Sequence, residues 1–232
     1  MKLHISDGGK GGVGKSNTAL ALINFLSANN KKVLVVETDT RNPDVIRCIK
    51  NSKRKLTGSY ADLRSEEGWN DLLELIEANA NKFDHAVMSL PGSDLSISKY
   101  AELTREVCAN KSVEINHYFT INRQPDSLNQ LAQSIDSEFG SISNRRIVVL
   151  NGLFGAREKF DRFDDSGIKQ NSSLIEIFIP ELFWKMQDAF WTSGLTHAEF
   201  ADSANSALIK SRINQWANFV NSEFEKIFVG EE

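Results

Sequence analysis

Residues 9–16 read Gly-Lys-Gly-Gly-Val-Gly-Lys-Ser, and this stretch carries the clearest architectural signal in the chain. It matches G-x-x-x-x-G-K-[ST], the pattern of a phosphate-binding loop, at every defined position. Its four glycines allow backbone conformations that a Cβ would forbid, so successive N–H groups can turn inward around an anion. The sequence predicts a strand before the loop and a helix after it, which is the setting that this motif requires.

Each part of the loop has an expected contact with a bound triphosphate. Lys15 is placed to reach the β- and γ-phosphates, and the Ser16 hydroxyl to ligate Mg²⁺. The N-terminus of the following helix adds positive partial charge. Nucleotide-binding residues are therefore predicted at Gly9, Lys10, Gly11, Gly12, Val13, Gly14, Lys15, Ser16 and Asn17.

Composition is typical of one soluble α/β domain, which we expect to span residues 1–232. The chain is 41 % hydrophobic and 25 % charged, with a net charge of −4, so only a local patch could bind a polyanion. The two cysteines form no C-x-x-C pair, which argues against a zinc or iron–sulfur site and favours a reducing cytoplasm. The first strand begins at once, leaving no room for a signal peptide, and no run of about 18 apolar residues predicts a membrane span.

Strand-like and helix-like segments alternate along the chain. This alternation predicts a mostly parallel central sheet flanked by helices, the Rossmann-like three-layer sandwich of P-loop NTPases. Strands are predicted at residues 2–6, 32–37, 83–90, 113–121, 146–150 and 174–179. Helices are predicted at residues 17–27, 69–80, 96–111, 127–139 and 203–228. Residues 52–68 and 152–173 show no regular pattern.

The second predicted strand is followed by Glu-Thr-Asp-Thr-Arg-Asn-Pro-Asp, residues 37–44. Ligands of parallel sheets bind beyond the carboxyl ends of the strands. Asp39 is therefore the candidate for contacting Mg²⁺ and orienting an attacking water. The alternative is that Asp39 and Asp44 cap a following helix with Pro43 at its first position, and for Asp44 a capping or surface role is favoured.

The third predicted strand ends in Met-Ser-Leu-Pro-Gly, residues 88–92, and lacks an expected acid. A hydrolase of this type usually ends this strand with a carboxylate near Mg²⁺, whereas Ser89 stands there. A hydroxyl can hydrogen-bond a metal-bound water but brings no negative charge. The Leu-Pro-Gly turn at residues 90–92 is positioned to sense a γ-phosphate, or is simply a strand-to-helix turn.

The loop with its second lysine, Lys10, resembles the deviant Walker A motif of the ParA/MinD superfamily. Further positions resemble the family in the same order: residues 37–39 its Asp-x-Asp, residues 90–92 its switch II, and Asn151 the asparagine that reads adenine. The resemblance implies ATP and Mg²⁺ as cofactors. It places the base beside Asn151, Pro180 and Glu181, and the metal beside Ser16 and Asp39.

In that family, ATP is held between two subunits that face each other. The resemblance therefore implies a homodimer in the ATP state, with Lys10 reaching the partner's phosphates and Lys10, Lys15 and Asp39 as catalytic residues. Glu37 replaces the first Asp of the family's pair, and Ser89 replaces its Walker B acid. These two departures imply hydrolysis that is slow or needs a partner.

The function implied by this resemblance is a cytoplasmic ATPase that moves or positions a cargo in plasmid partition or mobilisation. Its expected partner is an adaptor that is ParB-like or relaxase-associated. Two alternatives stay open. Ser89 suits a nucleotide-gated regulatory or scaffold protein with little hydrolysis, and a dethiobiotin-synthetase-like ligase shares the loop and fold, although Lys10 argues against it.

Two surface features bear on other partners. Residues 50–55 read Lys-Asn-Ser-Lys-Arg-Lys, a basic patch that would give nonspecific, salt-dependent contacts to DNA phosphates or is simply a solvated loop; its cations are Lys50, Lys53, Arg54 and Lys55. The last predicted helix has an apolar stripe and a mixed polar face, which indicates docking on the core rather than membrane insertion. The stripe consists of Ile209, Ile213, Trp216, Val220, Phe224 and Ile227.

Overall fold

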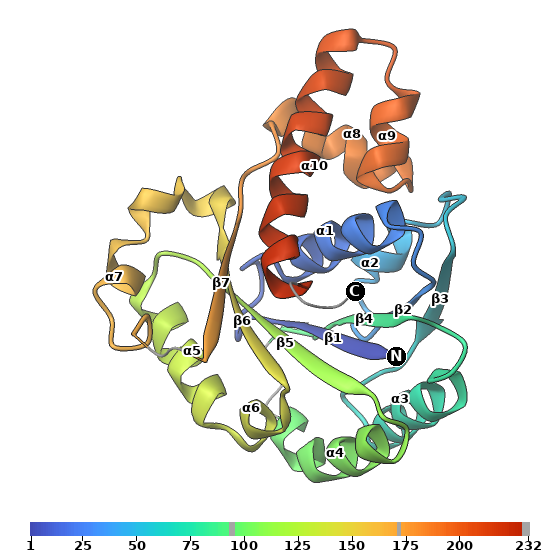
Figure 1. Cartoon of the computed structure of the whole chain (residues 1–232), viewed down its shortest axis with the longest axis vertical. Helices are drawn as coiled ribbons and strands as arrows, with labels where there is room; N and C mark the ends of the chain where they lie inside the picture. The colour runs from blue at the N-terminus through green and yellow to red at the C-terminus, as the bar shows by residue number, and fades with distance from the viewer. Residues whose placement is uncertain (93–95, 171–172, 229–232) are drawn as a thin grey trace.

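The computed structural model describes residues 1–92, 96–170 and 173–228, and a seven-stranded sheet lies at its centre (Figure 1). The strand order is β3-β2-β4-β1-β5-β6-β7, and every pairing between neighbouring strands is parallel. This confirms the predicted α/β class. The strands are β1 (Lys2–Asp7), β2 (Val33–Glu37), β3 (Leu56–Tyr60), β4 (His85–Ser89), β5 (Glu114–Ile121), β6 (Arg145–Asn151) and β7 (Leu174–Ile179).

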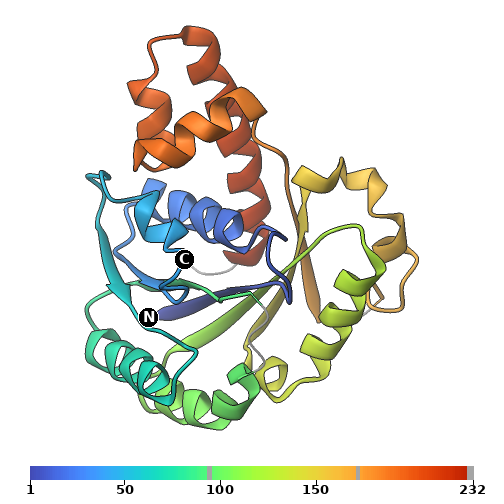
Figure 2. The ribbon, with the colours of Figure 1, turned by 180° about the vertical axis from the view of Figure 1, so that it is seen from behind.

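Helices cover both faces of the sheet, as the two opposite views show (Figures 1 and 2). One face carries α1 (Lys15–Ala28), α2 (Asp44–Arg47) and α10 (Ala207–Phe228). The other face carries α3 (Glu66–Asn79), α4 (Ala101–Asn110), α5 (Pro125–Asp136) and α6 (Glu138–Ile142). A lobe of α8 (Trp184–Ser193), α9 (His197–Ser203) and the start of α10 projects beyond the sheet (Figure 1).

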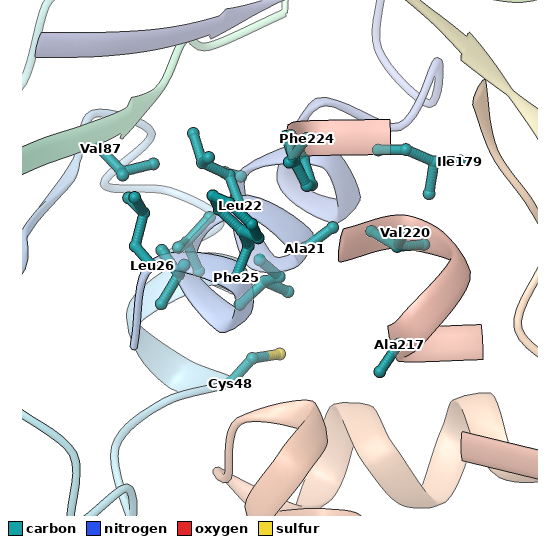
Figure 3. Packing of buried hydrophobic residues seen from close by; sticks show 14 of the residues in the cluster. Ala21, Leu22, Phe25, Leu26, Cys48, Val87, Ile179, Ala217, Val220 and Phe224 are labelled. Atoms are coloured by element: carbon teal, nitrogen blue, oxygen red, sulfur yellow. The ribbon is translucent and has the colours of Figure 1, made fainter. Parts of the chain in front are cut away.

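Helix α1 lies inside the molecule and holds the loop that precedes it. Its apolar residues face the sheet on one side and α10 on the other, with Leu22 and Phe25 near Phe224 and Leu26 near Val87 (Figure 3). A helix that is apolar all round is typical of a buried position. Because α1 cannot shift without disturbing this packing, the glycine loop at its N-terminus is attached to a rigid element.

Several predicted boundaries differ from the structure. Strand β3 was not predicted, since its sequence, Leu-Thr-Gly-Ser-Tyr, lies half exposed at the sheet edge and lacks the apolar run of a buried strand. The helix predicted over residues 127–139 is two helices, because the Ser137 hydroxyl accepts a hydrogen bond from Gly140 N and caps α6. The helix predicted from residue 203 begins at Ala207, after α9 has ended.

Short helical turns occupy the stretches between the main elements. The segment predicted as a helix over residues 96–111 begins as a 3-10 helix, η1 (Ser96–Tyr100), and continues as α4. The irregular stretch after β6 contains η2 (Gly152–Phe154), η3 (Arg157–Lys159) and α7 (Asp161–Asp164). Among the described residues, no helix is both long enough and apolar enough to cross a bilayer. Helix α10 docks on the core as expected, although Ile209 of its predicted stripe is exposed.

A buried histidine links the projecting lobe to α10. The His197 ring stacks between Phe190, at 3.9 Å, and Trp216, at 4.4 Å, and neither ring nitrogen has a hydrogen-bond partner among the described residues. Burial lowers the pKa of His197 from 6.5 to about 3. His197 is therefore neutral in the folded protein and protonates first in the unfolded chain.

This histidine predicts a loss of stability in mild acid. Because the folded pKa is depressed, the unfolded chain gains a proton as pH falls below about 6.5 while the folded protein does not. We expect the free energy of unfolding to fall by about 1–2 kcal/mol more between pH 6.5 and 5 in the wild type than in His197→Phe. Urea unfolding curves at both pH values measure the difference. Parallel losses in the two proteins would contradict this role of His197.

Candidate functional site

A pocket of about 360 Å³ opens at the carboxyl ends of the strands, where ligands of parallel sheets bind. The phosphate loop and the start of α1 form one wall, and the ends of β2, β4 and β6 form the floor. Residues that follow β7 close the far side. Its lining includes the predicted site residues Gly11, Gly12, Gly14, Lys15, Ser16, Asn17, Asp39, Asn151 and Glu181. Gly9, Lys10, Val13 and Pro180, which were also predicted, lie outside this lining.

The glycine loop turns through left-handed backbone conformations that require residues without a Cβ. Gly9, Gly12 and Gly14 have positive φ angles of 59°, 78° and 107°. A Cβ on Gly14 would also lie 2.1 Å from Asn151 Nδ2. Asn151 donates from this same nitrogen to the carbonyl oxygen of Val13 at 2.7 Å. Asn151, at the end of β6, therefore holds the loop in place, and its amide occupies the space that a side chain at position 14 would fill. We call this contact the brace.

The hydrogen bond between Asn151 and Val13 bears on the roles that were predicted for these two residues. Asn151 lies in the pocket, but its amide nitrogen binds the loop and its Oδ1 accepts from Leu153 N at 3.1 Å. Contact with a base therefore stays a prediction for Asn151. Val13 is buried, and its carbonyl oxygen accepts this hydrogen bond.

The two lysines of the loop are held differently. Lys15 is buried, and its Nζ donates to the carbonyl oxygen of Lys10 at 2.7 Å. Burial lowers the pKa of Lys15, and the charges of Asp7 and Asp39 partly oppose that shift. Lys10 instead points outward and forms an exposed ion pair with Asp126 Oδ2 at 2.7 Å. An exposed pair of this kind contributes little to stability, so Lys10 can exchange Asp126 for another anion at small cost.

Asp7, at the end of β1, supports the loop from below and was missed by the sequence analysis. Its Oδ1 accepts hydrogen bonds from Gly8 N at 2.6 Å and Gly9 N at 3.4 Å. Its Oδ2 lies 3.1 Å from His117 Nε2 on β5. An Asp directly before two glycines at a strand end is a turn signal that could have identified it. The contact with His117 depends on tertiary structure alone.

Two acids follow β2, and they have different environments. Glu37 is buried, and its Oε2 accepts from Val45 N at 2.9 Å at the start of α2. Burial raises the pKa of Glu37 to about 7, against the opposing effect of these N–H groups. Asp39 lies in the pocket, where its Oδ1 accepts from the N–H groups of Arg41 and Asn42 at 3.2 and 3.3 Å.

Of the capping or surface role expected for Asp44, the structure shows the surface role. Pro43 occupies the cap position itself, and Asp44 is the first helical residue, whose carboxylate pairs with Arg47 at 2.6 Å. Glu37, at the end of the preceding strand, caps the helix instead. Its Oε2 accepts hydrogen bonds from the free N–H groups of Val45 and Ile46. Asp39 stabilises the turn before the helix.

The donor set of the pocket fits a hydrated Mg²⁺ bound together with phosphate. The oxygens of Ser16, Glu37 and Asp39 line the same pocket, and oxygen ligands suit this ion. Mg²⁺ keeps several waters and takes few protein ligands when phosphate supplies the rest. Ser89 stands in register with Glu37 on the neighbouring strand and lines the floor. The acid nearest to this position along the sheet is therefore Glu37.

The far side of the pocket combines a backbone segment with aromatic side chains. Trp216 Nε1 donates to the carbonyl oxygen of Pro180 at 2.7 Å, which fixes the chain as it leaves β7. Glu181, Leu182, Phe190 and Trp191 then line the pocket. Pro180 thus positions the segment while its neighbours face the pocket.

The basic patch lies away from this pocket, between α2 and the edge strand β3. Lys50, Lys53 and Lys55 are exposed, and Arg54 is half-buried. The backbone of this loop is tied to the projecting lobe, since Asn51 N donates to Gly194 O at 2.7 Å and Lys53 N to Glu199 Oε1 at 2.8 Å. Contact with DNA stays a prediction for this patch.

A strand, a glycine loop with positive φ angles and a buried helix, arranged around an oxygen-lined pocket, define a phosphate-binding-loop nucleotide-binding protein. A match to a family of known proteins leads to the same class. Residues 7–181 match the CobQ/CobB/MinD/ParA nucleotide binding domain family, and the chain belongs to that family.

Similarities to individual proteins, in sequence and in fold, are consistent with this family. The chain is 30 % identical over 168 residues to protein MobD of Acidithiobacillus ferrooxidans, covering 72 % of this chain and 70 % of MobD. The fold is similar to that of the septum site-determining protein MinD of Pyrococcus horikoshii, solved with Mg-ADP, with a TM-score of 0.64, 14 % identity and coverage of 98 % and 97 %. It is also similar to a proposed plasmid partition protein of Borrelia burgdorferi B31 bound to AMPPNP, with a TM-score of 0.57, 16 % identity and coverage of 97 % and 98 %.

The contact of Asn151 with the loop predicts how a substitution at Gly14 affects stability, and the same substitution at Gly11 is the control. Gly14→Ala combines a positive φ with a collision at Asn151, whereas a Cβ on Gly11 would meet no atom within 4 Å. Without nucleotide, Gly14→Ala should lower the free energy of unfolding by about 1–3 kcal/mol, and Gly11→Ala should leave it within about 0.5 kcal/mol. Chemical denaturation measures both. Equal losses would show that the brace does not constrain position 14.

Proposed function

We propose that this protein is an ATP-dependent dimerising ATPase of the ParA type that acts in plasmid partition, mobilisation or positioning of a macromolecular cargo. The observation that carries the proposal is the pair of lysines in one loop. Lys15 lies in the pocket, while Lys10 lies outside it and faces solvent. The similarity to MobD over 72 % of the chain supports the link to mobilisation.

The pocket suits binding of ATP with Mg²⁺. The inward N–H groups of the loop and the N-terminus of α1 hold the phosphates, and the Lys15 ammonium moves from the Lys10 carbonyl to the β- and γ-phosphates. Ser16 and Asp39 would hold Mg²⁺, which would neutralise charge on the phosphates. Asn151, Pro180 and Glu181 border the side on which the base would lie.

Lys10 couples dimer formation to hydrolysis in this proposal. Its ammonium pairs with Asp126 in the single chain, on the outer surface of the loop. When a second subunit docks on this surface, its phosphates are stronger partners than an exposed carboxylate, so each Lys10 contacts the nucleotide of the other subunit. The charge that develops during hydrolysis is then neutralised only in the dimer.

The floor of the pocket argues for slow turnover. Ser89 brings no charge, and Glu37 is engaged with the N-terminus of α2 and has a raised pKa of about 7. Ser89 has no carboxylate, and both carboxylate oxygens of Glu37 already accept hydrogen bonds from backbone N–H groups. An adaptor protein, ParB-like or relaxase-associated, would accelerate the reaction by reorganising this floor.

The uncharged residue Ser89 in the floor of the pocket supports a second candidate function. A nucleotide-gated regulatory or scaffold protein needs ATP binding and pairing but no efficient hydrolysis, and Ser89 is compatible with that behaviour. In either case the nucleotide controls the association of two chains. Contacts of Lys50, Lys53, Arg54 and Lys55 with DNA would give either protein a place to assemble.

Replacing the outer lysine tests the dimer. Lys10→Ala should bind ATP within about 3-fold of the wild-type affinity but stay monomeric with ATP and Mg²⁺, because its ammonium contacts only the partner's phosphates. Lys15→Ala is the comparison, and it should lose about 10–100-fold in affinity, since it removes a charged hydrogen-bond donor inside the pocket. Fluorescence titration with an ATP analogue and light scattering give the two readouts. A dimer of Lys10→Ala with normal hydrolysis would refute the role in trans.

Restoring the missing acid separates the two candidate functions. If hydrolysis is limited by the uncharged floor, Ser89→Asp should raise the ATPase rate by about 10-fold or more, whereas Ser89→Ala should not raise it. Phosphate release in single-turnover assays measures the rate, and ATP affinity serves as the folding control. No acceleration by Ser89→Asp, in a variant that binds ATP and dimerises, would favour the scaffold.

A further inference from the structure

A second cavity, of about 310 Å³, lies on the other side of the phosphate loop from the nucleotide pocket. It is enclosed by the ends of β1 and β5, by α5 and α6, and by η1. Gly9 of the loop and Pro91 after β4 belong to its wall, and the two pockets share none of the lining residues that the structure describes. The two pockets are therefore separate but meet at the same loop.

One end of this cavity is polar and rich in hydrogen-bond acceptors. Asp7 and His117 form a buried pair there, with Oδ2 and Nε2 3.1 Å apart. Gln130 Oε1 is buried in the same wall and has no hydrogen-bond partner among the described residues. A buried carbonyl oxygen without a donor is costly, so a ligand that brings an N–H group would gain a hydrogen bond there.

The other end is apolar and aromatic. Ile97, Phe119 and Phe139 line it. The His117 ring lies edge-on to Phe119 at 6.2 Å and to Phe139 at 5.7 Å, which keeps these rings in place beside the polar pair. A cavity of this size with a few convergent polar groups is the usual form of a small-molecule site.

The charge of the wall selects the kind of ligand. Asp7 contributes the carboxylate, and no Lys or Arg is among the described lining residues. Burial alone would raise the pKa of Asp7, but the hydrogen bonds from His117, Gly8 and Gly9 bring it below its ordinary value. Asp7 is therefore an anion at neutral pH, and a cationic head group is favoured over an anionic one.

We propose that this cavity binds a small organic cation, an amidine or amine carried on an aromatic or alkyl body, and that its occupancy changes the affinity of the loop for nucleotide. The head group would lie by Asp7 and Gln130, and the body between Phe119 and Phe139. The coupling rests on the proposed nucleotide-binding function. The binding of the cation does not.

Helix α5 provides the physical link between the two pockets. Asp126 and Gln130 are four residues apart and lie on one face of the helix. Asp126 pairs with Lys10, and Gln130 packs so close to Gly9 that a Cβ there would lie 2.5 Å from Oε1. A ligand that draws Gln130 into the cavity releases this contact with the loop, so ligand and nucleotide affect each other's affinity equally.

Three small molecules of similar shape but different charge test which head group the cavity binds. Benzamidine, benzamide and benzoate present a cation, a neutral amide and an anion on the same ring. Ligand-detected NMR titration against the full-length protein should give benzamidine a dissociation constant at least about 10-fold below that of benzamide, with no binding of benzoate. Equal affinities, or no saturable binding of benzamidine, would overturn the site.

Two leucine substitutions on the same helix locate the binding. Ser134→Leu fills the cavity and should weaken benzamidine by about 10-fold or more, while Asn129→Leu, on the exposed face of α5, should leave it unchanged. Loss in both variants, or in neither, would place the binding elsewhere. ATP affinity, measured separately, shows whether each variant has folded and whether the nucleotide pocket works.

The coupling is tested by the same titration at saturating ATP. The dissociation constant of benzamidine should change by about 3-fold or more, and ATP affinity should change by the same factor at saturating benzamidine. An unchanged constant would refute the coupling. If ATP itself fails to bind while benzamidine does, the cation site stands and the proposed nucleotide function fails.

Discussion

The hydrogen bond from Asn151 to the Val13 carbonyl is the interaction on which the site depends. It holds the loop against the end of β6, and it exists because Gly14 leaves room for the Asn151 amide. On the other side, the loop continues into α1, whose apolar residues are buried between the sheet and α10. The loop is thus fixed at both ends before any ligand arrives. Such preorganisation lowers the cost of binding.

The charges around the loop are balanced by contacts that a nucleotide can replace. The Lys15 ammonium rests on the Lys10 carbonyl, and Lys10 itself rests on the exposed Asp126. Both contacts are weak in comparison with a hydrogen bond to phosphate. Glu37, by contrast, is committed to the N-terminus of α2, which leaves the pocket with fewer free acids than its lining suggests. This arrangement supports the proposal that hydrolysis is slow.

Helix α5 gives the loop a second neighbour besides the nucleotide. Its Asp126 and Gln130 contact Lys10 and Gly9, and Gln130 also lines the second cavity with the pair Asp7 and His117. An event on this side of the sheet can therefore reach the phosphate loop through the side chains of α5 that contact it. That proximity supports the proposed coupling between a small molecule in this cavity and the phosphate loop.

The α/β class, the phosphate loop and most of the parallel strands could be read from the sequence, because glycine spacing and apolar runs are local signals. The edge strand β3, the break between α5 and α6, and the exposed position of Ile209 could not, since they depend on which neighbours cover each segment. The same limit applies to the site. Local spacing determined where Lys15, Ser16 and Asp39 would lie, whereas the bonds of Asn151 to Val13, Asp7 to His117, Glu37 to α2 and Lys10 to Asp126 were decided only by the tertiary structure. The bonds of Asn151, Asp7 and Lys10 join segments far apart in the sequence that the sheet order brings together, and no local pattern encodes that order. The bond of Glu37 spans only eight residues and forms because the chain turns back between β2 and α2.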